Sequence, residues 1–379
     1  MRTFLFAGAL SATLLAAALP GASGPKFVMS YFYDQDKSEF TISDFQFPSV
    51  QHGMAVGLIQ DTKNGVPATI TTVDGGAHWS VAKVKELSSK DVPLSLYFTN
   101  QDEGWMVTER GLWYTQNFGG SWRRLGDLPK GMLRVWFLTA NHGWAIGANK
   151  QVIETTDGGK SWVPVAAAKE PPGAALNTTY SSIVFLRNKG IIAGWNKAKD
   201  TSSRPEWQTP GSHKYELPGT TIFLETGDGG KTWSSSSASM FGQLTKLAVS
   251  LSGTSLALFE FESKYDSNVR DLPPSEVHRT SLETGKTDRV FRDSSVQITD
   301  LALTLQGKPY LAGHEMVGTV RANPIPGKLK VFTSDDFVNW RAIPVDYRAN
   351  SHRSMVVIAE DREVWVATDT GMILKLQND

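Results

Sequence analysis

The sequence contains no cysteine in its 379 residues. The chain can therefore form no disulfide, no thiolate metal site and no cysteine nucleophile. It also has no excess of either charge, with 38 basic and 38 acidic side chains. A nucleic-acid partner normally requires a basic face that displaces counterions, so this balance argues against nucleic acid. The histidines are scattered and no Asp-rich loop has the spacing of calcium ligands, so we expect no metal and no cofactor.

Long apolar runs are absent after the N-terminus. Arg2 precedes a run of small and apolar residues that ends at Leu19, and small residues follow between Pro20 and Gly24. This order is typical of a secretory signal peptide. We therefore expect residues 1–24 to be a signal peptide and residues 25–379 to form one exported domain, periplasmic or secreted, in a bacterium. The alternative is an uncleaved membrane anchor, because the run is just long enough to span a bilayer; after cleavage we expect no stable membrane insertion.

A short phrase, Thr-x-Asp-Gly-Gly-x-x-Trp, recurs along the chain. The paired glycines permit backbone angles that a side chain would forbid. The acidic residue can accept hydrogen bonds from turn amides, and the tryptophan can bury a large area as the next strand begins. A residue required in every repeat indicates a structural role. The Asp or Asn and the Trp of the successive copies, the last of them worn, are Asp74, Trp79, Asn117, Trp122, Asp157, Trp162, Asp228, Trp233, Asp335 and Trp340.

Each copy closes a similar unit of four short β-rich runs. In the unit from Leu133 to Pro164, an apolar run, a turn, the run that starts at Trp144, a loop and a third run lead to the phrase. Four strands per unit and a regular repeat are typical of a propeller blade. We expect an all-β chain of seven antiparallel four-stranded blades, with six or eight as alternative counts. The expected units are 41–85, 94–124, 133–164, 180–233, 244–287, 297–344 and 354–376.

The last of these units has only three strands. The segment from Lys26 to Tyr33 has the pattern of a strand but no place in the first blade. We therefore expect it to complete the seventh blade, which would close the ring and leave no long unpaired edge.

The repeated phrase resembles the Asp-box, also called the bacterial neuraminidase repeat. That resemblance implies a β-propeller but no particular activity, since sialidases, xyloglucanases, sortilin-type receptors and assembly factors all carry it. The unit from Gly143 to Trp162 is most similar to the photosystem II stability/assembly factor family and its relatives in non-photosynthetic bacteria. Members of that family are exported seven-bladed propellers that bind proteins and catalyse nothing. The resemblance therefore implies a non-enzymatic binding or assembly module whose partner is another exported or membrane protein.

A carbohydrate-active hydrolase is the alternative function, with a glycan as the alternative partner. A sialidase would need an arginine cluster, and its first-blade Arg-Ile-Pro element is replaced here by the stretch from Ser43 to Pro48. Arg134 and Arg353 begin inner strands and are the candidates for facing the channel. Other glycosidases need two carboxylates at a defined separation, and the sequence does not pair the many loop acids.

Three neighbouring blades depart from the repeat at the same place. Insertions at 197–219, 263–275 and 316–327 follow the second strand of blades four, five and six. In a propeller these connections lie on the face opposite the Asp-box turns, so they would form one raised rim. Aromatic and arginine side chains dominate typical interfaces. The predicted rim residues are Arg204, Trp207, His213, Tyr215, Lys264, Tyr265, Arg270 and Arg321.

Overall fold

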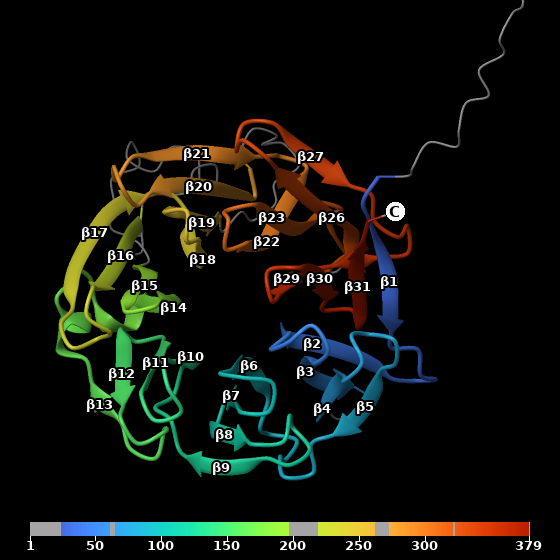
Figure 1. The fold of residues 1–379 in the computed structure, drawn as a ribbon, viewed down its shortest axis with the longest axis horizontal. Helices are drawn as coiled ribbons and strands as arrows, with labels where there is room; N and C mark the ends of the chain where they lie inside the picture. Colours follow the sequence, from blue (N-terminus) through green and yellow to red (C-terminus); the bar gives the residue numbers. More distant parts are fainter. Residues whose placement is uncertain (1–23, 61–64, 197–218, 262–272, 321–322, 379) are drawn as a thin grey trace, which may run out of the picture.

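The computed structural model describes residues 24–60, 65–196, 219–261, 273–320 and 323–378. Seven antiparallel sheets surround a central axis, as Figure 1 shows. The predicted all-β, seven-bladed propeller is confirmed, and each blade begins within two residues of its expected start. The expected signal peptide, residues 1–24, lies almost wholly outside the described residues.

The first three blades follow the same four-strand order, from the inner strand outward. Blade 1 contains β2 (Glu39–Gln46), β3 (Gly53–Gln60), β4 (Gly65–Thr72) and β5 (Ser80–Lys83). Blade 2 contains β6 (Pro93–Phe98), β7 (Gly104–Thr108), β8 (Gly111–Thr115) and β9 (Arg123–Gly126). Blade 3 contains β10 (Met132–Phe137), β11 (Gly143–Gly147), β12 (Gln151–Thr155) and β13 (Val163–Pro164).

The next three blades keep this order around the insertions. Blade 4 contains β14 (Thr178–Leu186), β15 (Lys189–Asn196), β16 (Gly219–Thr226) and β17 (Ser234–Met240). Blade 5 contains β18 (Gln243–Val249), β19 (Thr254–Glu260), β20 (Ser275–Ser281) and β21 (Thr287–Arg292). Blade 6 contains β22 (Val296–Leu303), β23 (Pro309–Glu315), β26 (Gly327–Ser334) and β27 (Trp340–Ile343).

Blade 7 joins the two ends of the chain. Its strands are β29 (Ser354–Ala359), β30 (Glu363–Thr368), β31 (Met372–Gln377) and β1 (Lys26–Phe32). The outer pair is antiparallel, with Lys26 opposite Gln377 and Phe32 opposite Met372. In Figure 1 the blue β1 lies beside the red β31. The predicted closure by the N-terminal strand is therefore confirmed.

A few short elements lie between these strands. They are η1 (Ala166–Lys169), η2 (Ala175–Asn177), β24 (Thr319–Val320), β25 (Asn323–Pro324) and β28 (Asn350–Ser351). The strands β24 and β25 form a small hairpin within the blade 6 insertion, and β28 pairs with β26. Across the described ranges, no helix has the length and apolar character needed to span a bilayer.

The hydrophobic core is divided into seven clusters, one between each pair of neighbouring blades. Between blades 3 and 4, Trp144 stacks on Phe185 with ring centroids 4.7 Å apart, and Trp233 meets Trp144 edge-on at 5.9 Å. A Cβ on Gly230 would lie 2.1 Å from the Trp144 ring, so the Asp-box turn approaches closely only because it carries glycine. Related aromatic groups occupy the interfaces of blades 2 with 3 and 7 with 1.

Short-range hydrogen bonds fix the Asp-box turns. In blade 1, Thr72 Oγ1 donates to Asp74 Oδ1 at 2.8 Å and accepts from the Gly76 amide at 2.9 Å. Asp74 Oδ1 also accepts from the His78 amide at 2.9 Å. The copies at Asn117, Asp157 and Asp228 make the same three contacts. These bonds favour the ionised carboxylate, and the His78 amide is the main cause that lowers the pKa of Asp74 to about 2.

The worn copy in blade 6 differs from its predicted register. Asp336, not Asp335, accepts the amides of Val338 and Asn339, at 2.8 and 2.7 Å. Ser334 takes the place of the threonine and donates to Asp336 Oδ1 at 3.0 Å. The turn is one residue shorter than the turn of blade 1. It has a single left-handed residue, Phe337 with φ +63°, whereas the turn of blade 1 has two left-handed glycines. Asp335 instead forms exposed ion pairs with Lys308 and Arg341, so the expectation for Asp335 was wrong.

Candidate functional site

The predicted rim residues cannot be placed. Arg204, Trp207, His213 and Tyr215 of the blade 4 insertion lie outside the described residues, as do Lys264, Tyr265 and Arg270 of blade 5 and Arg321 of blade 6. The described residues of the channel, and of its mouth on the face opposite the Asp-box turns, form the candidate site.

The inner strands surround the axis and share one irregularity. In six of them the pairing with the second strand slips by one residue near the start of the strand. Such a bulge bends a strand and re-aims the side chain that follows. The residues that follow the slip occupy equivalent positions around the ring; they are Asp44, Ser95, Arg134, Ser182, Lys246 and Asp300.

Asp44 joins blade 1 to blade 2. The carboxylate is 6% exposed and accepts the Leu96 amide at 2.7 Å and the Phe45 amide at 2.9 Å. Burial raises the pKa of Asp44, although the charge of Arg134 and the amide bonds act in the opposite direction. Arg134 thus lies in the inner strand β10, where its charge acts on a buried acid. Whether it reaches the open channel stays a prediction.

Asp300 joins blade 6 to blade 7 in the same way. Its Oδ2 accepts the Val356 amide at 2.9 Å, and its Oδ1 lies 2.8 Å from Lys246 Nζ. Ser182 holds blade 5 in a similar way, by accepting the Leu247 amide at 2.9 Å. Asp44 and Asp300 are therefore engaged in joining blades. These two acids do not form the pair of free carboxylates that a glycosidase requires.

Arg353 lies at the channel mouth opposite the Asp-box turns, just before β29. Its side chain is 54% exposed, and its Nη2 lies 3.4 Å from Glu260 Oε1. Glu260, at the end of β19, is mostly buried and accepts Gln297 Nε2 at 3.3 Å. Through these two contacts, Glu260 links β19 of blade 5 to β22 of blade 6 and to the start of blade 7. Among the described residues, the other guanidinium donors of Arg353 have no hydrogen-bond partner.

His352 connects the blade 7 turn to the blade 6 insertion. Its Nδ1 lies 3.1 Å from Asp369 Oδ2, and its amide donates to Asp369 Oδ1 at 2.9 Å. Its Nε2 lies 3.2 Å from the carbonyl oxygen of Pro324 in β25. Both ring nitrogens thus face acceptors, which fixes the ring and anchors the insertion to the mouth.

His314 lies beneath this surface in β23. It is 8% exposed, and among the described residues its Nδ1 has no hydrogen-bond partner. Burial lowers the pKa of His314, so its imidazole is neutral near pH 7. Neither the histidines nor the acids assemble a metal centre, since no group of three or more such ligands occurs within the described ranges.

Sequence reasoning named Arg353 as a candidate for facing the channel, but it missed the acids that join the blades and the other groups at the mouth, Glu260 and His352. A weak signal for the acids exists, because Asp44 and Asp300 lie in the interior of inner strands and each directly precedes an apolar residue. Glu260 and His352 carry no such signal. Glu260 and Arg353 become neighbours only through the ring.

Comparison with known proteins places the chain among propellers. The family model described as photosynthesis system II assembly factor YCF48 matches residues 127–198, and no curated protein matches. The structure titled YCF48 bound to D1 peptide has a TM-score of 0.59 and 16% identity, covering 94% of this chain and 98% of that one. YCF48 from Cyanidioschyzon merolae has a TM-score of 0.58 and 15% identity, covering 94% and 99%. The WD40 propeller domain of Doa1 has a TM-score of 0.53 and 9% identity, covering 93% and 97%.

These solved structures share the fold at low identity, whereas the family match covers blade 3 and the first half of blade 4. The turns described above supply the Asp-box hydrogen bonds in blades 1 to 4. The chain is therefore a seven-bladed Asp-box β-propeller that resembles the YCF48 family of photosystem II assembly factors.

Proposed function

We propose that this chain is an exported, non-enzymatic propeller that binds a segment of another exported or membrane protein. The binding face is the channel mouth opposite the Asp-box turns. The proposal rests on a difference between the buried and the exposed polar groups of the inner face. Buried acids such as Asp44 and Asp300 are occupied by backbone amides, while Arg353 at the mouth is more than half exposed.

The chemistry of the mouth suits a polypeptide ligand. Within the described ranges, Glu260 is the one side-chain partner of the Arg353 guanidinium, so further donors remain for a ligand. Arginine is enriched at interface hot spots because it combines several hydrogen bonds with a large contact area. The strands that flank the three insertions end or begin at this face, which supports the choice of face. A polypeptide ligand is supported by a structure of the same fold that is titled YCF48 bound to D1 peptide.

Site-specific photo-crosslinking in the native host tests the binding face. A benzophenone amino acid replaces Gln297, which contacts Glu260 at the mouth and leaves Arg353 in place, or, as the matched control, Val73, which is 63% exposed in the Asp-box turn of blade 1. We expect the mouth position to give one dominant adduct, which mass spectrometry maps to a single segment of an exported or membrane protein. Equal adducts from both positions, or adducts from Val73 alone, would contradict the chosen face.

The glycoside-hydrolase alternative makes a different prediction. It requires turnover of aryl glycosides that falls when a mouth acid such as Glu260 is changed to Gln. We expect the purified protein to show no turnover above a heat-denatured sample across a panel of 4-methylumbelliferyl glycosides. Turnover that the Glu260→Gln variant loses would replace the binding proposal with a hydrolase.

Export is tested separately, in cells of the native host. Cell fractionation followed by N-terminal sequencing should find the chain outside the cytoplasm, with an N-terminus near Pro25. A full-length chain that stays with the membrane after a salt and carbonate wash would instead support the uncleaved anchor.

A further inference from the structure

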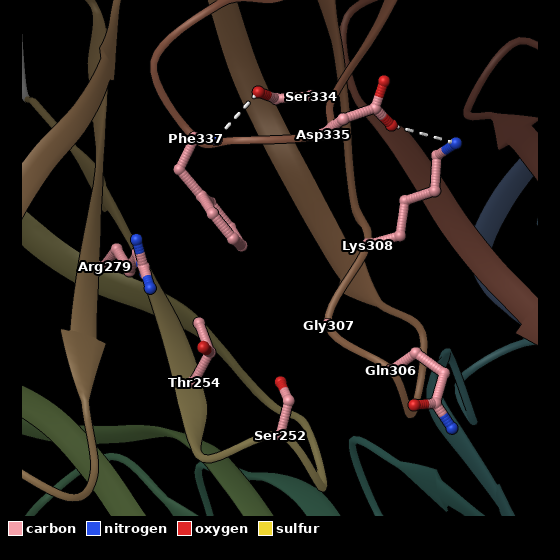
Figure 2. Close-up of a pocket in the computed structure, with 9 residues that line it drawn as sticks. All are labelled: Ser252, Thr254, Arg279, Gln306, Gly307, Lys308, Ser334, Asp335 and Phe337. Atoms are coloured by element: carbon pink, nitrogen blue, oxygen red, sulfur yellow. Dashed lines mark hydrogen bonds and ion pairs between the residues drawn. The ribbon is translucent and has the colours of Figure 1, made fainter.

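A hollow of about 410 Å³ opens between blades 5 and 6 on the Asp-box face, away from the proposed binding mouth. Its walls come from the first turns of both blades, from β20 and from the worn Asp-box turn. Figure 2 shows Arg279 beside Phe337 on one side of the space and Lys308 on the other, with Ser252 and Thr254 below. Ligand pockets for small molecules have volumes of about 300–1,000 Å³, so the hollow can take a small organic molecule.

The hollow lies where the aromatic packing of the repeat is interrupted. Between blades 3 and 4 the interface is filled by Trp144 of the second strand and Phe185 of the next inner strand. The strand registers place Leu256 and Leu303 at the equivalent positions between blades 5 and 6. In this interface, two aliphatic side chains therefore take the places of the two stacked aromatic rings.

The main cation of the hollow has no counter-charge. Arg279 is half-buried, and its guanidinium lies 4.5 Å from the centre of the Phe337 ring. In the described part of the chain its side chain makes no ion pair or hydrogen bond. Asp288, its cross-strand neighbour, pairs with Lys286 instead, at 3.1 Å. A guanidinium that stacks on a ring keeps its planar fork of donors available for an anion.

The remaining charges also leave the hollow positive. Lys308 lies 3.3 Å from Asp335, but Asp335 already pairs with Arg341 at 2.6 Å. The three cations Arg279, Lys308 and Arg341 are thus balanced at the hollow by Asp335 alone, because the carboxylate of Asp336 is occupied by the amides of its own turn. An anion entering the hollow would meet two cations, hydroxyl groups and one aromatic face.

We propose that this hollow is a second binding site, specific for a carboxylate on a small or flexible group, with Arg279 as the principal donor. The carboxylate accepts both donors of the guanidinium fork, and Phe337 packs against the organic part of the ligand. The source is either a free organic acid or an acidic side chain of a bound polypeptide. The site does not depend on the mouth, so either proposal can fail without the other.

The test uses 4-fluorobenzoate as the probe and 4-fluorobenzamide as its uncharged counterpart, with ¹⁹F relaxation as the readout. We expect saturable broadening of the benzoate and at least about tenfold weaker binding of the benzamide, because charge-assisted hydrogen bonds are roughly twice as strong as neutral ones. Arg279→Met should weaken benzoate binding at least about tenfold and Arg279→Lys should retain part of it. The control Arg123→Met removes an arginine that also stacks on a ring, that of Tyr114, and should change nothing.

Folding of each variant is checked by circular dichroism before titration. If Arg279→Met does not fold, Lys308→Met is the second variant and should weaken binding at least about threefold, because it also removes a cation of the hollow. Displacement of the probe by N-acetyl-glutamate amide assigns the site to acidic side chains, and failure of displacement assigns it to free aromatic acids. Equal binding of benzoate and benzamide, unchanged binding by the folded arginine variant, or no broadening would overturn the proposal.

Discussion

Trp144 offers the sharpest test of how the ring is held together. It is fully buried, stacks on Phe185 at 4.7 Å with an interplanar angle of 19°, and packs against Gly230 of the next Asp-box turn. Replacing a buried tryptophan or phenylalanine by alanine typically costs about 3–5 kcal/mol of unfolding free energy. Because the surrounding sheets are tied by many backbone bonds, the site cannot collapse fully. We therefore expect Trp144→Ala and Phe185→Ala each to cost about 4 kcal/mol.

The stacked geometry predicts that these two losses are not additive. Aromatic pairs contribute about 0.5–1.5 kcal/mol beyond the area that they bury. The double variant should therefore be more stable than the sum of the single losses predicts by about 1 kcal/mol. Urea unfolding of the four proteins at pH 7, followed by tryptophan fluorescence and circular dichroism, measures this coupling.

A second cycle supplies the control. Trp105 is also fully buried, but it stacks on Phe137 in a different interface. Trp144→Ala and Trp105→Ala should add within about 0.5 kcal/mol, since distant sites without shared partners are usually independent. Additive losses for Trp144 with Phe185, or equal coupling in both cycles, would refute the argument that each interface is held by its own aromatic stack.

Three further predictions follow from the described contacts. Asp336→Ala should lower the urea midpoint more than Asp335→Ala, because Asp336 caps turn amides whereas Asp335 forms exposed ion pairs. The pKa values of Asp74 and Asp228 are lowered to about 2, so their stabilisation should be complete above about pH 4, the unfolded value, and lost as the pH falls toward 2 in acid titrations of thermal stability. Asp300→Ala should cost about 2–3 kcal/mol in urea unfolding, because it leaves a buried amide unpaired.

Each of these predictions has an outcome that would contradict it. Equal urea midpoints for the Asp335 and Asp336 variants would contradict the assignment of Asp336 as the residue that caps the turn. An Asp74→Asn, Asp228→Asn double variant that keeps the wild-type acid profile would show that these carboxylates do not carry the loss. A change at Asp300 below about 0.5 kcal/mol, which is typical of a surface substitution, would mean that the amide finds another partner.

The turns were predictable because their determinants are local. In blade 1 the hydrogen bonds of Thr72 and Asp74 span only two to four residues, so a fixed spacing of residue types encodes them. The closure by β1 was predictable for a related reason: the last unit lacked one strand and an unassigned strand stood at the other end. Where local signals conflict, the sequence fails. Thr333 and Ser334 both suit the turn, and pairing of Thr333 with Tyr310 in the neighbouring strand decides the register.

The candidate sites depended on the ring. Arg353 and Glu260 are 93 residues apart in sequence, and their contact exists because blades 5 and 7 converge on one channel mouth. The hollow at Arg279 lies at the interface in which Leu256 and Leu303 take the aromatic positions, an equivalence that is known only from the strand registers. The sequence alone determined the fold class, the blades and the turn chemistry, since these follow from short-range periodicity. Tertiary structure decided which charges are engaged and which are left free, because that depends on the packing of blades distant in sequence.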